Sequence, residues 1–247
     1  MTRRAQRGLV WLEPGGDPEH FPPVEQALEE PPGLLAAGGD LRPERLLAAY
    51  RRGIFPWYSP GQPILWWCPD PREVLFPDDF RRSRSLAKRE RNAGFELRVD
   101  TAFAAVTDAC AAPRETDGGG TWITVEMRAA YLALHQLGHA HSFETWRDGT
   151  LVGGFYGVRL GGVFFGESMF SREPDASKVA LSFLVRACPD LGVSLIDCQM
   201  ASRHLASLGA RSLPRAEFLQ RIASLVDEKR PQWTASGSSS PPKTHLD

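Results

Sequence analysis

The chain has 247 residues, of which 42% are hydrophobic and 24% charged, a composition that is typical of a soluble globular protein and excludes wholesale disorder. A chain of this length holds one or two domains and buries enough surface to fold without disulfides or a structural metal. The 29 basic and 30 acidic residues give a net charge of −1. Any contact with nucleic acid must therefore come from a local basic patch.

The spacing of the cysteines and the length of the apolar stretches limit the cellular compartments in which the protein could function. The four cysteines show no C-x-x-C spacing, which leaves redox and zinc motifs without support and favours a reducing cytoplasm. The apolar stretch Gly8–Leu12 is too short for a signal peptide, and no run reaches the length of a membrane span. His135 and His139 are spaced like zinc ligands, but Gln136 stands where a metalloprotease needs its glutamate. We expect a cytoplasmic protein with no membrane partner and no metal.

The first third of the chain predicts short helices. The pattern is helical from Phe21 to about Gly53, with Pro22-Pro23 opening one segment and Pro43 placed to open the next. Gly53 would close it. After a proline-rich stretch, Ile64 to Trp67 predicts a short strand.

Asp70-Pro71 is a natural hinge. We expect a small N-terminal domain over residues 1–70 and a larger domain over 71–230. Ser, Pro and Gly dominate from Pro231 onward, which predicts a disordered tail over 231–247.

The larger domain predicts alternating helices and strands. In chain order these are a strand over 72–76, a basic helix over 83–92, a strand over 95–99, helices over 101–112 and 125–135, strands over 141–147, 150–160 and 163–169, a helix over 176–187, a strand over 194–200 and a helix over 214–226. Turn signals at Asp148-Gly149 and Gly161-Gly162 make the three central strands an antiparallel meander. The fold class is therefore α+β, with a mixed, largely antiparallel sheet flanked by helices.

The sequence lacks the motifs of three large enzyme classes: the α/β-hydrolases, the P-loop NTPases and the dinucleotide-binding enzymes. It contains no G-x-S-x-G, no G-x-x-x-x-G-K-[ST] and no dinucleotide-binding G-x-G-x-x-G before a helix.

A basic segment stands out in this nearly neutral protein. The eleven residues after Phe80 hold six arginines and lysines against the single acid Glu90. Arg84 and Lys88 share a helix face, as do Lys88 and Arg91. This segment is either a solvated helix or a contact with a phosphate backbone, which would make binding sensitive to salt.

Several tryptophans lie in or beside loops. Trp66 and Trp67 belong to an apolar strand and are better explained as core residues. Trp57 and Trp122 are the better candidates for stacking on unpaired bases.

The strand over 194–200 carries an unusual set of polar residues. Alternation along a strand puts Asp197 and Gln199 on one face and Cys198 on the other. A buried carboxylate beside a carboxamide is costly unless both are satisfied, so either a structural network or a site is implied, and Cys198 is disfavoured as a nucleophile. Glu167, another acid among apolar residues, is either a buried pair or a receptor for a cation.

Seven collinear motifs between about residues 20 and 226 resemble one family, the leucyl/phenylalanyl-tRNA–protein transferases. They are GLLAAGGDL at 33–41, RRGIFPW at 51–57, ILWWCPDPR at 64–72, GTWIT at 120–124, LGHAHS at 137–142, GESMFS at 166–171 and LIDCQ at 195–199. The resemblance implies a bacterial cytosolic enzyme that moves Leu or Phe from charged tRNA to proteins beginning with Lys or Arg, marking them for degradation. It also implies a catalytic domain related to the GNAT acyltransferases, with no metal and no coenzyme.

The resemblance also implies roles for individual residues. Asp197 and Gln199 match the catalytic pair, with Glu167 beside them. The other matches are Trp57 and Trp122 at the tRNA's terminal adenosine, Arg84, Lys88 and Arg91 in the basic helix that meets the acceptor stem, and Phe155, Phe164, Leu184 and Ile196 around the transferred side chain.

The implied reaction is direct aminolysis of an ester, with no covalent enzyme intermediate. We expect the protein to be a monomer, although the sequence itself does not give the oligomeric state. We hypothesise that Gln199 accepts a hydrogen bond from the incoming amine and that Asp197 fixes Gln199. A GNAT-type enzyme that uses an acyl-CoA is one alternative, although residues 171–178 lack the glycines that such enzymes present to the pyrophosphate. An RNA-binding module without catalysis is the other, and it leaves the three polar residues unexplained.

Overall fold

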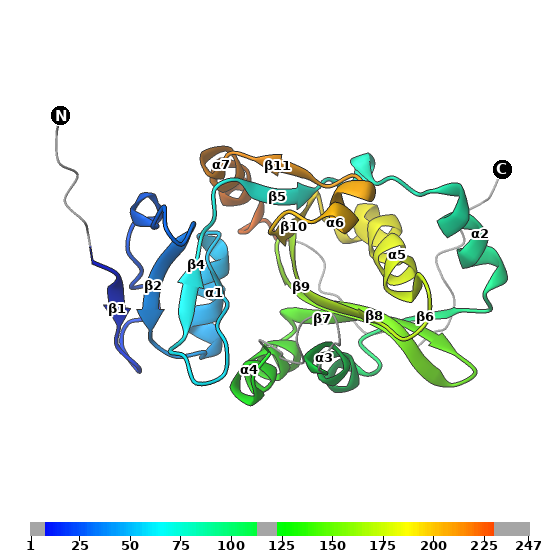
Figure 1. Ribbon diagram of the computed structural model, residues 1–247, viewed down its shortest axis with the longest axis horizontal. Coiled ribbons are helices and arrows are strands. Elements are labelled where there is room, and N and C mark those ends of the chain that lie inside the picture. Colours follow the sequence, from blue (N-terminus) through cyan, green and yellow to red (C-terminus); the bar gives the residue numbers. More distant parts are fainter. Residues whose placement is uncertain (1–7, 113–122, 230–247) are drawn as a thin grey trace.

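The computed structural model describes residues 8–112 and 123–229, which form two sheets and their helices (Figure 1). The smaller sheet has the strand order β1-β2-β4-β3. Its strands are β1 (Val10–Leu12), β2 (Leu34–Gly38), β3 (Phe55–Pro56) and β4 (Leu65–Trp67), and α1 (Pro43–Arg51) connects β2 to β3. A single turn of 3-10 helix, Val24–Gln26, precedes β2.

The prediction of short helices throughout residues 21–53 is wrong for β2. All five residues of Leu34–Gly38 are buried, and the strand lies between β1 and β4. A short apolar run that is buried on both faces has no alternation, so its pattern does not distinguish a strand from a helix. The helix opened by Pro43 is confirmed, with Gly53 two residues beyond its end.

The larger sheet has seven strands in the order β11-β5-β10-β9-β8-β7-β6. They are β5 (Arg72–Leu75), β6 (Glu96–Val99), β7 (Ala140–Arg147), β8 (Thr150–Leu160), β9 (Val163–Ser171), β10 (Leu195–Gln199) and β11 (Arg211–Leu213). Only β9 and β10 pair in parallel; the other neighbours are antiparallel. The predicted α+β class and the central meander are confirmed, including the hairpin at Asp148-Gly149, where both residues have positive φ.

Helices cover both faces of this sheet. α5 (Ala176–Leu191) packs against one face of β7 and β8, and α3 (Phe103–Ala111) and α4 (Val125–Gln136) pack against the other (Figure 1). The remaining helices are α2 (Arg84–Asn92), α6 (Arg203–Ser207) and α7 (Arg215–Leu225), with a 3-10 turn at Pro77–Asp79. α6 and β11 were not predicted, and α5 runs past its predicted end at Ala187.

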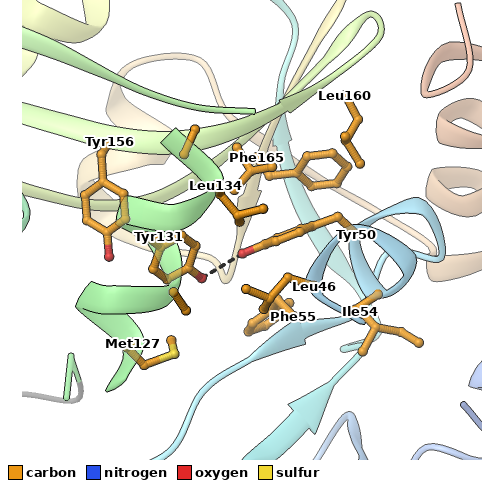
Figure 2. Packing of buried hydrophobic residues seen from close by; sticks show 14 of the residues in the cluster. Leu46, Tyr50, Ile54, Phe55, Met127, Tyr131, Leu134, Tyr156, Leu160 and Phe165 are labelled. Atoms are coloured by element: carbon orange, nitrogen blue, oxygen red, sulfur yellow. Dashed lines mark hydrogen bonds between the residues drawn. The ribbon is translucent and has the colours of Figure 1, made fainter. Parts of the chain in front are cut away.

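The two sheets share one apolar core. Tyr50 of α1 and Tyr131 of α4 approach each other across the boundary between them, as Figure 2 shows. α7 adds a second connection, because Arg215 bonds to Asp70 and to Cys68 in the segment that joins the sheets. Gly53 allows α7 to come this close, since a Cβ there would lie 2.8 Å from Phe218. The N-terminal part is therefore held firmly against the larger sheet.

Within the described ranges, no helix has the length and apolar character needed to cross a membrane. The same ranges contain no group of three or more His, Cys, Asp or Glu side chains arranged to hold a metal ion.

Candidate active site

Two β-bulges lie side by side where β9 and β10 separate. The strands pair only from Leu195 to Asp197, opposite Val163 to Phe165. Immediately beyond, the register of β9 against β8 skips Glu167, and that of β10 against β5 skips Cys198. A bulge redirects the side chains around it, and bulges are frequent next to active sites.

Gln199 ends β10 in the left-handed region, with φ 62°. This conformation is uncommon for a residue with a side chain and is found mostly where the structure constrains it. It turns the carboxamide toward β9, and Gln199 Nε2 donates a hydrogen bond of 3.0 Å to Glu167 Oε1. The backbone N–H of Gln199 donates to Asp197 Oδ1 at 2.9 Å. The three polar residues singled out in the sequence thus lie together.

A cavity of about 330 Å³ opens where the two strands part. Its polar wall includes Glu167, Ser168, Asp197 and Gln199. Its apolar wall is formed by Phe155, Phe164, Met169, Leu181 and Ile196.

Three of the four residues expected around the transferred side chain, Phe155, Phe164 and Ile196, line this cavity. Leu184 does not: it is fully buried in the same apolar cluster, and Leu181, earlier on α5, occupies the wall. The rings of Phe155 and Phe164 meet edge to face at 5.9 Å, which gives the apolar end a rigid boundary.

Asp197 is completely buried and paired with Arg72 of β5. Arg72 Nε and Nη2 donate to the two carboxylate oxygens at 2.8 and 2.6 Å. The guanidinium carbon lies 4.7 Å from the ring centres of both Phe55 and Phe218. Burial alone would lower the pKa of Arg72, but the charge of Asp197 and its hydrogen bonds together outweigh burial and raise that pKa, so the guanidinium stays ionised.

Glu167 is enclosed by hydroxyl groups. Tyr50 and Tyr131 contact its two carboxyl oxygens at 2.7 and 2.6 Å. Removal from water raises the pKa of Glu167 to about 7, although the hydrogen bonds from the tyrosines act in the opposite direction. Burial and the nearby charge of Glu167 place the pKa of each tyrosine well above its usual value, which keeps both phenols protonated.

Cys198 lines the cavity as an inert thiol. Burial is the main reason that its pKa is raised far above the ordinary cysteine value, and the charge of Asp197 adds to the effect. A thiol in this state is a poor nucleophile, in agreement with the sequence analysis.

Trp57 directly follows β3 of the smaller sheet and does not line the cavity. Its side chain is 43% exposed, and its ring packs at 5.6 Å on that of Trp67, which is half-buried rather than a core residue as predicted. Trp66 is fully buried, as predicted. Trp122 falls outside the residues that the structure describes.

A second depression adjoins Trp57. This groove of about 960 Å³ runs between the loop that follows β3 and the start of α4. Tyr58, the neighbour of Trp57, bonds across it to Thr124 at 3.2 Å. The loop that carries Trp57 is therefore fixed against the larger sheet's helices.

The basic segment forms α2 beside α5. Arg84, Lys88 and Arg91 are exposed, and within the described part of the chain none of them pairs with an acid. Glu90, the single acid, is occupied by Arg82 and Arg186. The helix thus presents unneutralised positive charge.

Tyr50, Tyr131 and Arg72 were missed as site residues. The two tyrosines sit at apolar helix positions where an aromatic core residue is expected, so the local pattern gave no signal. Arg72 directly follows the predicted hinge and is the first residue of a buried strand. Burying an arginine without a partner is costly, so its position could have indicated that it pairs with a buried acid.

Comparison with known proteins decides the family. The family model described as leucyl/phenylalanyl-tRNA protein transferase matches residues 74–223, and the model of that family's N-terminal domain matches residues 39–70. The chain belongs to this family. The family and the enzyme class expected from the sequence, a transferase, are thereby confirmed.

Among the curated relatives, the leucyl/phenylalanyl-tRNA–protein transferase of Thiobacillus denitrificans is 63% identical over 87% of this chain and 94% of its own length. That of Aromatoleum aromaticum is 63% identical, covering 89% and 91%. Similar solved structures include a GCN5-related N-acetyltransferase from Kribbella flavida (TM-score 0.37, 14% identity, covering 68% of this chain and 59% of that one). L-PGS from Bacillus licheniformis has a TM-score of 0.41 at 11% identity, covering 78% and 73%. Similarity at this level says nothing about activity.

Proposed function

We propose that this transferase moves Leu or Phe from charged tRNA to the N-terminal amine of proteins that begin with Lys or Arg, in the cytoplasm and as a monomer. The observation that carries the proposal is the cavity between β9 and β10, which places an apolar pocket against Asp197, Gln199 and Glu167. An aminoacyl ester has the same two ends, an apolar side chain and a polar carbonyl.

The reaction is direct aminolysis. The amine nitrogen forms a bond to the ester carbonyl carbon, the bond from that carbon to the ribose oxygen breaks, and the proton lost by the amine balances the one gained by the ribose oxygen. An α-amine has a pKa of about 7.7–8.0, so much of it is already neutral at cellular pH. Holding the amine and the ester together is worth up to about 10⁵–10⁸ M in effective concentration, more than the roughly 10²–10⁴-fold of a general base. Positioning the two reactants therefore contributes more to the rate than a general base would.

Gln199 positions the amine in this proposal. A carboxamide is a weak base but a good hydrogen-bond acceptor, and the side-chain oxygen of Gln199 is the atom that receives the amine's N–H. Asp197 acts through Gln199, because its carboxylate is fixed by Arg72 and accepts the backbone N–H of Gln199. No metal and no coenzyme enter these steps.

The charged tRNA has two candidate contacts. Arg84, Lys88 and Arg91 offer unpaired positive charge to the acceptor stem. The exposed face of Trp57 can stack on the terminal adenosine, and Trp122 stays a candidate for the same role.

An acyl-CoA donor is disfavoured at α5, the helix that follows β9. A helix start binds phosphate through free N–H groups, but the N–H of Ser177 already bonds to Ser171 Oγ at 2.9 Å. Asp175, the N-cap residue, makes no capping hydrogen bond and is paired with Lys178 at 2.7 Å, and a Cβ at Gly153 would lie 2.4 Å from Ala176, so the helix start is packed against β8. The N–H groups of Ala176 and Ser177 are therefore both occupied, and the close packing on β8 leaves a pyrophosphate little space.

One assay distinguishes charged tRNA from an acyl-CoA as the source of the transferred group. The protein is incubated with leucyl-tRNA and a peptide that begins with Arg, without any acyl-CoA, and the peptide is sequenced by mass spectrometry. The proposal expects a new Leu-Arg N-terminus. A parallel incubation offers an acyl-CoA in place of the charged tRNA. Transfer only in that incubation, or tRNA binding with no transfer, would each refute the proposal.

A further inference from the structure

Three oxygen-bearing side chains close a ring beside the cavity. The phenol oxygens of Tyr50 and Tyr131 are 2.7 Å apart, Tyr50 Oη is 2.7 Å from Glu167 Oε1, and Tyr131 Oη is 2.6 Å from Glu167 Oε2. Each distance is that of an O–H···O hydrogen bond. Figure 2 shows the two tyrosines reaching each other from α1 and α4. The ring thus joins α1, in the N-terminal part of the chain, to α4 and to β9, the middle strand of the larger sheet.

Each of the three contacts needs a proton of its own. The two phenols supply two protons, and with an ionised Glu167 both are donated to the carboxylate. The phenol oxygens would then face each other at 2.7 Å with no proton between them. A proton on Glu167 satisfies every contact: Oε2 donates to Tyr131, Tyr131 donates to Tyr50, and Tyr50 donates to Oε1. The geometry therefore matches a neutral carboxylic acid.

The ring also determines how Gln199 presents its amide. In the neutral acid, Glu167 Oε1 is a carbonyl oxygen that only accepts, and it receives hydrogen bonds from Tyr50 and from Gln199 Nε2. Because the amide nitrogen is held there, the amide oxygen is turned away from Glu167. Among the residues that the structure describes, Gln199 Oε1 has no hydrogen-bond partner, and Gln199 lines the cavity.

We propose that Tyr50 and Tyr131 are positioning residues that hold Glu167 as a neutral acid in this ring, and that the ring directs the carbonyl oxygen of Gln199 to the acceptor amine. The role of Gln199 rests on the proposed function. The ring itself does not, so the two are tested separately.

The protonation of Glu167 is tested by infrared spectroscopy. The difference spectrum between the wild type and Glu167→Gln at pH 6 is expected to show the carbonyl band of a carboxylic acid. In Tyr131→Phe that band shifts to higher frequency, because the acid loses its acceptor. A wild type that shows only a carboxylate band at pH 6 would overturn the ring, whether or not the protein transfers amino acids.

The positioning role is tested by kinetics. Tyr50→Phe and Tyr131→Phe are each expected to lower kcat about tenfold, with the KM for charged tRNA and for the peptide nearly unchanged. Thr107→Val is the matched control: Thr107 is also buried and its hydroxyl donates a hydrogen bond of 2.9 Å to Ala104 O, but it does not line the cavity. Its kcat should equal that of the wild type.

Unchanged kcat in both ring variants, or an equal loss in Thr107→Val, contradicts the positioning role. Because Tyr50 and Tyr131 lie on different helices, a folding defect in one variant leaves the other to decide. A wild type without transfer activity refutes the proposed function, and the infrared result then stands alone as the test of the ring.

Discussion

The carboxylate of Asp197 accepts two hydrogen bonds, 2.8 and 2.6 Å long, from Arg72, and neither side chain is more than 1% exposed. Removing one partner of such a pair leaves a buried charge, whereas replacing both by apolar groups removes the need for a partner. The pair therefore constrains Asp197 more than it stabilises the fold.

A double-mutant cycle tests this relationship. Arg72→Met and Asp197→Leu should each lower the free energy of unfolding by about 3–5 kcal/mol, and the double variant should regain most of that loss. Urea unfolding measures stability, and single-turnover transfer measures activity. We expect the double variant to be folded but inactive. Activity in the double variant would show that Asp197 has no role in positioning Gln199.

Glu167 should make stability depend on pH. Its folded-state pKa is raised from 4.5 to about 7, so the folded protein binds more protons than the unfolded chain between these values. The free energy of unfolding therefore falls as pH rises through this window, by at most about 3 kcal/mol because the cavity admits some solvent. In Glu167→Gln this part of the decline should disappear. Urea unfolding at pH 5 and pH 7.5 measures the change in the free energy of unfolding, and Glu96→Gln, at an exposed position, is the control. If wild type and Glu167→Gln lose the same stability between these pH values, the expectation is contradicted.

The size of the apolar pocket should set the choice of amino acid. Phe155→Leu opens space on the cavity wall, so transfer of Phe should rise relative to Leu, by about 10-fold or more. Phe143→Leu is the control, because Phe143 stacks on Phe155 at 5.0 Å without lining the cavity. Competition between the two charged tRNAs gives the ratio. Binding of uncharged tRNA should stay unchanged, and its loss would assign Phe155 to tRNA contact instead.

The exposed cations of α2 should govern salt dependence. Replacing Arg84, Lys88 and Arg91 by Gln should weaken tRNA binding and make the slope of log K against log salt concentration shallower by about 2–3. Arg221→Gln is the control, since Arg221 is exposed but paired with Glu217 at 2.8 Å. Titrations of labelled tRNA at several salt concentrations provide both values. An unaltered slope would show that α2 is a solvated helix that does not contact the tRNA.

Much of the larger domain could be predicted because its signals are local. The hairpin at Asp148-Gly149 needs two positive φ values, which these residue types adopt readily, and the helix capped by Thr124 begins where expected. β2 could not be predicted, because its burial depends on β1 and β4.

The polar residues of the site were visible in the sequence, but their arrangement was not. Alternation predicts that Asp197 and Gln199 share a face, yet the meeting of Gln199 with Glu167 depends on two bulges in separate strands. Tyr50 lies 117 residues from Glu167 along the chain, so no local pattern connects them. Contacts of this kind follow from the packing of the two sheets and not from any one segment.

The carboxamide of Gln199 is tested most directly by Gln199→Glu in single-turnover transfer from leucyl-tRNA to a peptide that begins with Arg. This change keeps the size of the side chain but removes the N–H that bonds to Glu167 Oε1. We predict a rate about a hundredfold below the wild type with tRNA binding intact. A rate equal to that of the wild type would contradict the proposed role of Gln199.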